Sequence, residues 1–300
     1  MEMTLMNRLL ITFLISIIGM PVTAQDAEWY LEVGAGFMVS DTLRQAGFNG
    51  DNICYPTNAC ANQPTGYRWF YDLDADVGSN LEAAVGRSFG KYRLEIAASN
   101  RKSDLNQLFD SISHLDGSTL ESASTDNYSY SDETRIDSIS ASSLTLNIYM
   151  DLPLADLPVD PYIGAGAGLS RAKLSGLYFS SRYECVREPC DAEYPASFYN
   201  SHQVVNLMDT VLNANVSAGV DWDVREDISL GLKLSYVMTG NLKQQAGYIN
   251  HPISGIENTT KISEMSRWSL TVRLRYWIAR YHTLMHCKQV SRIGIRSSKL

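Results

Sequence analysis

Alternating apolar and polar residues recur in eight segments of the chain, and the last segment is the clearest. From Trp268 to Ile278 every second residue is apolar, and the residues between them up to Arg275 are Ser, Thr or Arg. Successive side chains of a β-strand point to opposite faces. This segment therefore predicts a strand with one apolar face and one charged face. Seven earlier segments repeat the pattern, which predicts an all-β protein.

The connections between the eight predicted strands alternate between long and short. The strands lie near 29–39, 81–89, 92–99, 144–150, 162–171, 212–222, 228–236 and 267–278. Long polar segments at 40–68, 102–135, 175–208 and 239–266 alternate with short turns at 90–91, 151–160 and 223–227. Outer-membrane barrels place long loops outside the cell and short turns in the periplasm. The alternation predicts an eight-stranded antiparallel transmembrane β-barrel with long extracellular loops and short periplasmic turns.

The N-terminal segment predicts export from the cytoplasm. Arg8 precedes an apolar run of about 12 residues, and Val22-Thr23-Ala24 suits a signal peptidase, so residues 1–24 are expected to be a signal peptide cleaved between Ala24 and Gln25. The run is shorter than the roughly 20 residues that a spanning helix needs. No later apolar run reaches that length, and a membrane protein without such helices must be a barrel. We therefore predict Sec-dependent export and a place in the bacterial outer membrane.

The two faces of the predicted strands suit a membrane barrel. The inner face carries both signs of charge, so a paired polar interior is expected. The predicted lumen charge network consists of Glu32, Glu82, Arg93, Glu95, Asp221, Lys233, Arg273 and Arg275. Aromatic residues collect where strands meet the periplasmic interface, as in the girdles of such barrels. The predicted girdle consists of Trp29, Phe89, Tyr92, Tyr149, Tyr162, Trp222 and Tyr276. A soluble ligand-binding barrel is the alternative, but it turns its apolar face inward and needs neither feature.

The second strand is expected to project beyond the bilayer. Its apolar phase continues backward from Leu81 through Val77, Ala75, Leu73, Tyr71 and Trp69. Between them lie Asp72, Asp74 and Asp76, which suggest a calcium loop. The helix-loop-helix calcium loop has glycine at its sixth and glutamate at its twelfth position, whereas Gly78 is seventh and Glu82 eleventh here. No metal site and no cofactor is therefore predicted.

Four of the five cysteines form two close pairs in polar segments. Cys54 with Cys60 and Cys185 with Cys190 predict two local disulfides in an oxidising compartment. No histidine lies near either pair in sequence, and the spacings miss the usual zinc patterns. Cys287 is left without an assigned role.

Short motifs in the middle of the chain resemble a known group of barrels. The segment from Tyr162 to Leu169, the segment from Ser217 to Trp222 and the segment from Leu230 to Tyr236 are similar to small outer-membrane barrels grouped as opacity proteins, surface antigens and outer membrane protein A-like porins. The resemblance covers Trp29 to Ile278 and implies eight strands with both termini in the periplasm. Residues 25–278 are therefore expected to form the barrel domain. It also implies that the assembly machinery reads the closing strand from Trp268 to Ile278.

The closing strand departs from the family pattern at its end. Related chains end on an aromatic residue, whereas Ile278 holds that place here and a basic segment, residues 279–300, follows it. This tail is expected to be periplasmic and disordered.

Composition favours a surface protein over an enzyme. The five histidines lie in predicted loops or in the tail, where His114 with Asp116 and Ser201 with His202 are the only local pairings. A hydrolase needs its base and nucleophile on rigid strand ends. An outer-membrane hydrolase of the lipid A deacylase or protease type and a narrow channel remain as alternatives. The net charge of −8 makes nucleic acid an unexpected partner. Expected partners are membrane lipid, lipopolysaccharide and a host or cell-surface ligand of the loops.

Overall fold

The computed structural model describes residues 27–59, 64–122, 127–152, 158–190, 194–263 and 265–278. The predicted signal peptide, the predicted tail and Cys60 lie outside the described residues. No helix in the described part of the chain is both long enough and apolar enough to cross a membrane.

Eight strands form a closed ring. They are β1 (Ala27–Ser40), β4 (Gly78–Phe89), β5 (Tyr92–His114), β7 (Ser138–Asp151), β8 (Asp160–Cys185), β9 (Ser201–Arg225), β10 (Ile228–Thr239) and β13 (Ser266–Trp277). Each strand pairs antiparallel with the next, and β13 pairs back onto β1 with Leu31 opposite Tyr276 and Val39 opposite Trp268. The prediction of an eight-stranded antiparallel barrel is confirmed.

The apolar faces of the ring point outward and the polar faces point inward. Leu144 and Leu212 on the outside are 60% and 68% exposed, whereas Glu32 and Arg273 are 3% and 2% exposed inside. A soluble barrel would show the opposite arrangement, because water would then bathe its outer surface. The outward apolar belt is therefore the surface that contacts lipid.

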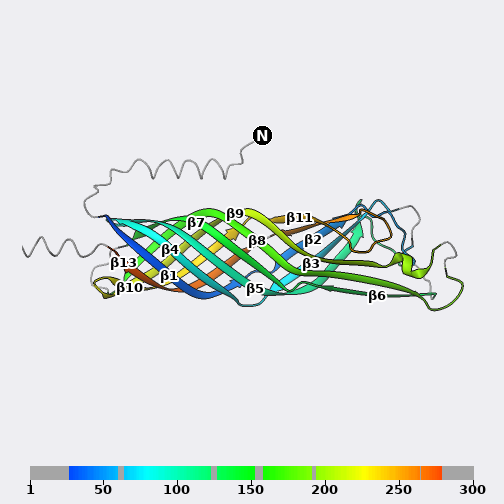
Figure 1. Ribbon diagram of the computed structural model, residues 1–300, viewed down its shortest axis with the longest axis horizontal. Helices are drawn as coiled ribbons and strands as arrows, with labels where there is room; N and C mark the ends of the chain where they lie inside the picture. Colours follow the sequence, from blue (N-terminus) through cyan, green and yellow to red (C-terminus); the bar gives the residue numbers. More distant parts are fainter. Residues whose placement is uncertain are drawn as a thin grey trace, which may run out of the picture.

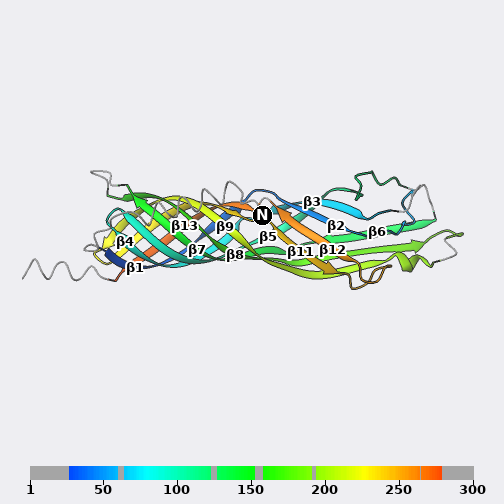
Figure 2. The same cartoon turned by 90° about the horizontal axis from the view of Figure 1, so that it is seen from above.

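Three strands continue far beyond the length that a bilayer requires. β5, β8 and β9 contain 23, 26 and 25 residues, whereas about 9–11 tilted residues span the hydrocarbon. Beyond the ring they are joined by β2 (Leu43–Asn49), β3 (Tyr67–Ala75), β6 (Tyr128–Arg135), β11 (Leu242–Gly247) and β12 (Glu257–Ser263). Figures 1 and 2 show this outer extension continuing the long axis of the barrel. The segments predicted as long loops are therefore largely β-sheet, which corrects that expectation.

The extension has its own apolar core, and it lies inside. The core side chains that are at most 1% exposed come from strands on all sides of the extension and from one connection: Leu43, Leu73, Ile139, Ala172, Leu174, Leu207, Leu242, Ile262 and Met265. Outside the bilayer, apolar side chains gain free energy by leaving water, so they turn inward. For this reason, the prediction that the apolar side chains from Trp69 to Val77 continue the outward face of the second strand is wrong. β3 and β4 are separate strands, and Tyr71 and Leu73 pack in the core.

One disulfide lies at the far end of β8. Cys185 and Cys190 are bonded, which confirms that predicted pair. Cys54 is also disulfide-bonded, but its predicted partner Cys60 lies outside the described residues.

Replacing Cys185 and Cys190 by serine should loosen only the tip of the extension. Closing so short a loop contributes about 2 kcal/mol in the chain-entropy model. We expect faster amide hydrogen exchange in residues 178–190 and unchanged exchange in the membrane-spanning strands. Slower or equal exchange at the tip would show that the bond does not restrain it. The single variant Cys54→Ser separates this local effect from that of the other bonded cysteine.

Candidate functional site

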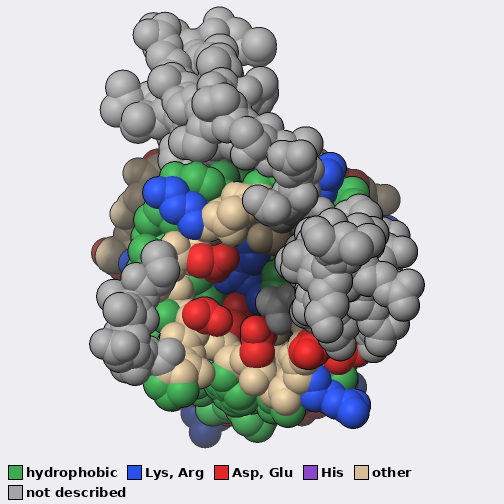
Figure 3. All heavy atoms as spheres, turned by 90° about the vertical axis from the view of Figure 1, so that its left-hand side faces the viewer, with side chains coloured by type: hydrophobic (Ala, Val, Ile, Leu, Met, Phe, Trp, Pro, Cys, Tyr) green, Lys and Arg blue, Asp and Glu red, His purple; other side chains and the backbone are tan. Residues whose placement is uncertain are grey.

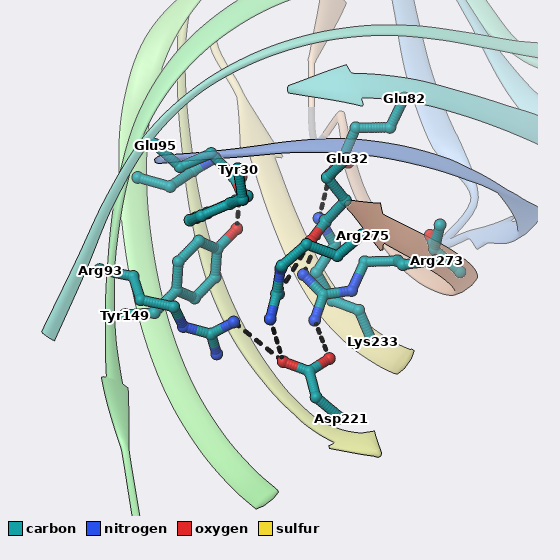
Figure 4. Close-up of polar contacts among 12 residues, drawn as sticks. Tyr30, Glu32, Glu82, Arg93, Glu95, Tyr149, Asp221, Lys233, Arg273 and Arg275 are labelled. Carbon is teal, nitrogen blue, oxygen red and sulfur yellow. Dashed lines mark hydrogen bonds and ion pairs between the residues drawn. The ribbon is translucent and has the colours of Figure 1, made fainter. Parts of the chain in front are cut away.

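The lumen is built around Asp221, which projects inward from β9. Its carboxylate accepts hydrogen bonds from Arg93 Nη1 at 2.9 Å, from Arg273 Nη2 at 2.8 Å and from Arg275 Nη1 at 2.8 Å. Glu32 on β1 accepts from Arg273 Nη1 and Arg275 Nη2, both at 2.8 Å. Figure 4 shows two arginines of β13 held between these two carboxylates. The result is a continuous ion-pair network across the barrel.

A second branch of the network lies on the other side of Glu32. Lys233 on β10 pairs with Glu82 on β4. Glu95 on β5 accepts hydrogen bonds from the hydroxyls of Tyr30 and Tyr149, each at 3.0 Å. The structure thus places all eight predicted network residues in the lumen. Glu95 joins the ion-pair network through Tyr149 and Tyr30, whose rings lie against Arg93 and Arg275. The pair of Lys233 and Glu82 lies beside it, with an oxygen of Glu82 within 4.8 Å of oxygens of Glu32 and Glu95.

Strand register explains why these charges meet. Glu32 lies opposite Arg275 and Gly34 lies opposite Arg273 on the neighbouring strand. Side chains opposite one another on paired strands share a face. On the other side of β13, Gly231 of β10 lies opposite both Arg273 and Asp221. Because Gly231 has no side chain, the guanidinium of Arg273 reaches across it to the carboxylate of Asp221. Seen from the end where β1 begins, acidic and basic side chains gather in the middle of the mouth, inside a rim with many hydrophobic side chains (Figure 3).

Two of the seven predicted girdle aromatics lie inside the lumen instead. Tyr149 and Tyr162 are 2% and 1% exposed, and their rings pack edge to face 5.5 Å apart. A side chain at Gly164 or Gly219 would collide with these rings, so the glycines on the inner face make room for them. Trp29 and Tyr276 are exposed on the outer face, and Phe89, Tyr92 and Trp222 are half-buried at the periplasmic end.

The alternation of apolar and polar residues in the sequence already indicates that Tyr149 points inward. Tyr149 stands between Ile148 and Met150, which belong to the apolar phase, so its side chain must point inward. Sequence analysis also missed Tyr30, which is fully buried beside Trp277 in the lumen. Arg101 and Arg267 were missed as well. They are buried between the charge network and the apolar core, and neither has an ion-pair partner among the described residues.

Three lumen carboxylates approach one another closely enough to suggest a cation site. Oxygens of Glu32, Glu82 and Glu95 all lie within 4.8 Å of one another. However, Arg273 and Arg275 neutralise Glu32, Lys233 neutralises Glu82, and two tyrosine hydroxyls satisfy Glu95. The arrangement is that of an internally compensated network. The grouping of Glu188 with Cys185 and Cys190 involves a disulfide and so offers no thiolate ligands.

The histidines of the extension lie apart from one another. His114 packs against Tyr67, His202 packs against Tyr178, and His251 places Nε2 at 3.3 Å from the buried carboxylate of Asp51. Neither His114 nor His202 forms an ion pair with an acid among the residues that the structure describes. Within the described ranges no side-chain hydrogen bond or ion pair joins His114 to Asp116 or Ser201 to His202.

A cluster of tyrosines fills the tip of the extension. Tyr55 stacks on Tyr183 with ring centroids 5.6 Å apart, and Tyr199 packs against both. Burial raises the pKa of Tyr183 to about 12, so its hydroxyl stays neutral at physiological pH. These rings give the tip a fixed shape.

The sheet of the extension is open between β5 and β6. β5 pairs with β7 only as far as Asp104 opposite Ser138, and beyond that point it pairs with β3 alone. β6 pairs only with β8. Within the described part of the chain no ladder joins β5 to β6. We call this opening, flanked by residues 106–112 of β5 and by β6, the lateral seam.

The middle part of the chain is similar to a known family. Residues 58–179 match a protein family described as surface antigen. The match covers less than half of the chain. It runs from β3 into β8, so it includes membrane-spanning strands and a large share of the extension.

Solved barrels show only distant likeness to this chain. Neisserial surface protein A is 13% identical over 84% of this chain and 99% of its own, with a TM-score of 0.37. OprG from Pseudomonas aeruginosa is 13% identical over 83% of this chain and 95% of its own, also with a TM-score of 0.37. A major outer membrane protein from Thermus thermophilus is 10% identical over 85% of this chain and 100% of its own, with a TM-score of 0.40. No curated protein sequence matches significantly.

Proposed function

We propose that this protein is an outer-membrane surface antigen, that it binds a partner through its outer extension, and that the barrel itself serves as a closed anchor. The observation that carries the proposal is the lateral seam, where apolar side chains of the inner face remain in contact with water. A binding role is supported because contiguous exposed apolar side chains outside the membrane commonly mark interaction sites.

The exposed side chains of the seam come from both flanking strands. Phe109 lies opposite Tyr71, and Ile112 lies opposite Trp69, so both point toward the inner side of the sheet. They are nevertheless 59% and 43% exposed. On β6, Tyr130 lies opposite the buried Tyr183 and is 46% exposed.

The backbone at the seam offers a second recognition element. Strand edges that lack a partner present N–H and C=O groups in a regular row, and an extended segment of another protein can pair with them. Acidic side chains on β6, Asp132 and Glu133, are exposed beside this edge. The matching partner is an extended peptide segment that carries apolar residues and positive charge.

The anchor is expected to conduct poorly. The network around Asp221 crosses the lumen, and the apolar core of the extension lies beyond it. An eight-stranded barrel is just wide enough for side chains to fill. We therefore favour the closed anchor over the narrow channel, and conductance in planar bilayers measures the difference directly.

Charging the seam should weaken adhesion strongly. Cells that display the variant Ile112→Lys/Tyr130→Lys are expected to adhere to cultured host cells, or to one another, about tenfold less than cells with the native protein, because buried apolar anchors dominate interface energies. Adherent cells are counted after washing, and heat-dependent gel mobility shows that the variant still folds.

The matched control is Val204→Lys/Ile249→Lys. These residues are also apolar and exposed on the extension, at 53% and 68%, but they lie away from the seam. Equal losses in both variants, or no loss in the seam variant, would contradict the proposed binding role.

A further inference from the structure

Three cations lie close together on the outer wall of the barrel, on β5 and β8. Lys102 and Lys173 both lie opposite Ser140, and Arg171 lies opposite Ser142 in the neighbouring row of outward residues. The next row toward the membrane contains Ala98, Leu144 and Leu169, which belong to the apolar belt. Residues opposite one another share a face, so all three cations point away from the lumen.

None of these three cations has an acidic partner among the described residues. Arg171 donates from Nε to the Sδ of Met208 at 2.8 Å, and its two terminal amino groups have no acceptor within the described ranges. In contrast, the four cations of the lumen network are all paired. The outer three are therefore available to an anion that comes from outside the protein.

A groove of about 630 Å³ opens beside Arg171 on the same wall. The groove is lined by small side chains, among them Ala83, Ala98 and Ser142, and by the larger apolar side chains of Leu81, Leu144 and Leu169. Thr210 and Arg171 line the groove from the next row toward the extension. A hydrocarbon chain fits such a surface, since the apolar belt already faces lipid at this level.

The cations also lie at one level of the membrane and on one side of the barrel. They stand directly above the apolar belt, on the side of the long connections, where lipid headgroups begin. The outward residues of β1, β10 and β13 include no lysine or arginine in their described ranges. At that level they present Tyr236 and Trp268, whose rings lie 4.9 Å apart. The positive charge at this level thus gathers on the face of β5, β7 and β8.

We propose that this face binds a phosphate-bearing glycolipid of the outer leaflet. One acyl chain lies in the groove, and the phosphate contacts Arg171 with Lys173 and Lys102 beside it. A guanidinium matches the geometry of a phosphate, and lysines add positive charge without fixing orientation. The outward carboxylate of Asp104, one row further from the membrane, sets the limit of the positive surface.

Lipid titration tests the site on the full-length folded barrel. The protein is reconstituted in nanodiscs of neutral lipid, and bound diphosphoryl lipid A is counted by native mass spectrometry. We expect the variant Lys102→Gln/Arg171→Gln/Lys173→Gln to bind at least about tenfold more weakly than the native protein, since each cation near an anionic surface contributes to binding. The variant Ala98→Phe fills the groove without changing charge and should also weaken binding.

The matched control is Lys91→Gln/Lys243→Gln/Lys261→Gln, which removes the same charge at exposed positions elsewhere. It should bind lipid A within about twofold of the native protein, because headgroup attraction falls off within a Debye length. Equal weakening in the control, unchanged binding in Ala98→Phe, or equally tight binding of dephosphorylated lipid A or phosphatidylglycerol would overturn the proposal. The site lies on the barrel wall, so its failure would leave the proposed role of the seam unaffected.

Discussion

Replacing Arg273 by methionine should cost about 3–5 kcal/mol of unfolding free energy. Its side chain is 1% exposed and bonds both Glu32 and Asp221 at 2.8 Å. Methionine preserves much of the volume but leaves two buried carboxylates with fewer positive partners. Only Arg275 and Arg93 would remain to compensate them. Such uncompensated charge in a narrow lumen is far more costly than the loss of a surface ion pair.

Urea unfolding of the barrel in lipid vesicles measures this effect through tryptophan fluorescence. The control Arg225→Met removes an exposed arginine at the periplasmic end, and it should change the unfolding free energy by less than about 0.5 kcal/mol. A change below about 1 kcal/mol in the Arg273 variant would mean that water, and not the ion-pair network, solvates the lumen carboxylates.

Replacing Leu174 by alanine should destabilise the extension by about 3 kcal/mol while the membrane ring stays intact. Leu174 is fully buried in the apolar core, where removal of a leucine side chain leaves a cavity. The loss should concentrate in the extension, because the outward belt of the ring is held separately by lipid. Limited proteolysis of intact cells should then cut within β3, β6 and the outer part of β8, which should resist cleavage in the native protein.

The comparison variant is Leu212→Ala, on the lipid-facing side of β9. Leu212 is 68% exposed to the surroundings of the barrel, so lipid tails can fill the space that its side chain leaves. We expect no new cleavage in the extension of this variant. Cleavage of both variants at the same sites would indicate that the ring and the extension unfold as one unit.

The sequence predicts the ring well because one rule, alternation against lipid, governs it. Leu144, Leu212 and Leu232 all lie on the outward face as that rule requires. The structure of the long connections was harder to predict, because the apolar residues change faces there while the strand itself continues. On β8, Leu169 points outward and Leu174 inward; on β9, Leu212 points outward and Leu207 inward. Side chains continue to alternate between the two faces along each strand. The apolar residues, however, change from the outward-facing positions to the inward-facing positions.

The point at which the apolar residues change from the outward to the inward face marks where lipid ends and water begins. On β5 it falls between Ile96, which is outward and exposed, and Leu105, which is inward and buried. A search for strands whose apolar residues stay on one face stops at this point. It then assigns the remainder of the strand to a loop. Membership of the lumen network could be expected from sign and face alone. The specific pairing of Arg273 with both Glu32 and Asp221 depends on the register between β1, β13, β10 and β9, which no local pattern contains.

The long strands also determine how far the protein reaches beyond the membrane. At about 3.3 Å per residue, the 26 residues of β8 measure about 85 Å along the strand, and a tilt of about 40° leaves roughly 65 Å along the axis. The hydrocarbon layer takes only about 30 Å of this height. Roughly half of the strand therefore extends beyond the hydrocarbon layer. Anything that docks at its upper part would be held on the order of 30 Å beyond the hydrocarbon layer.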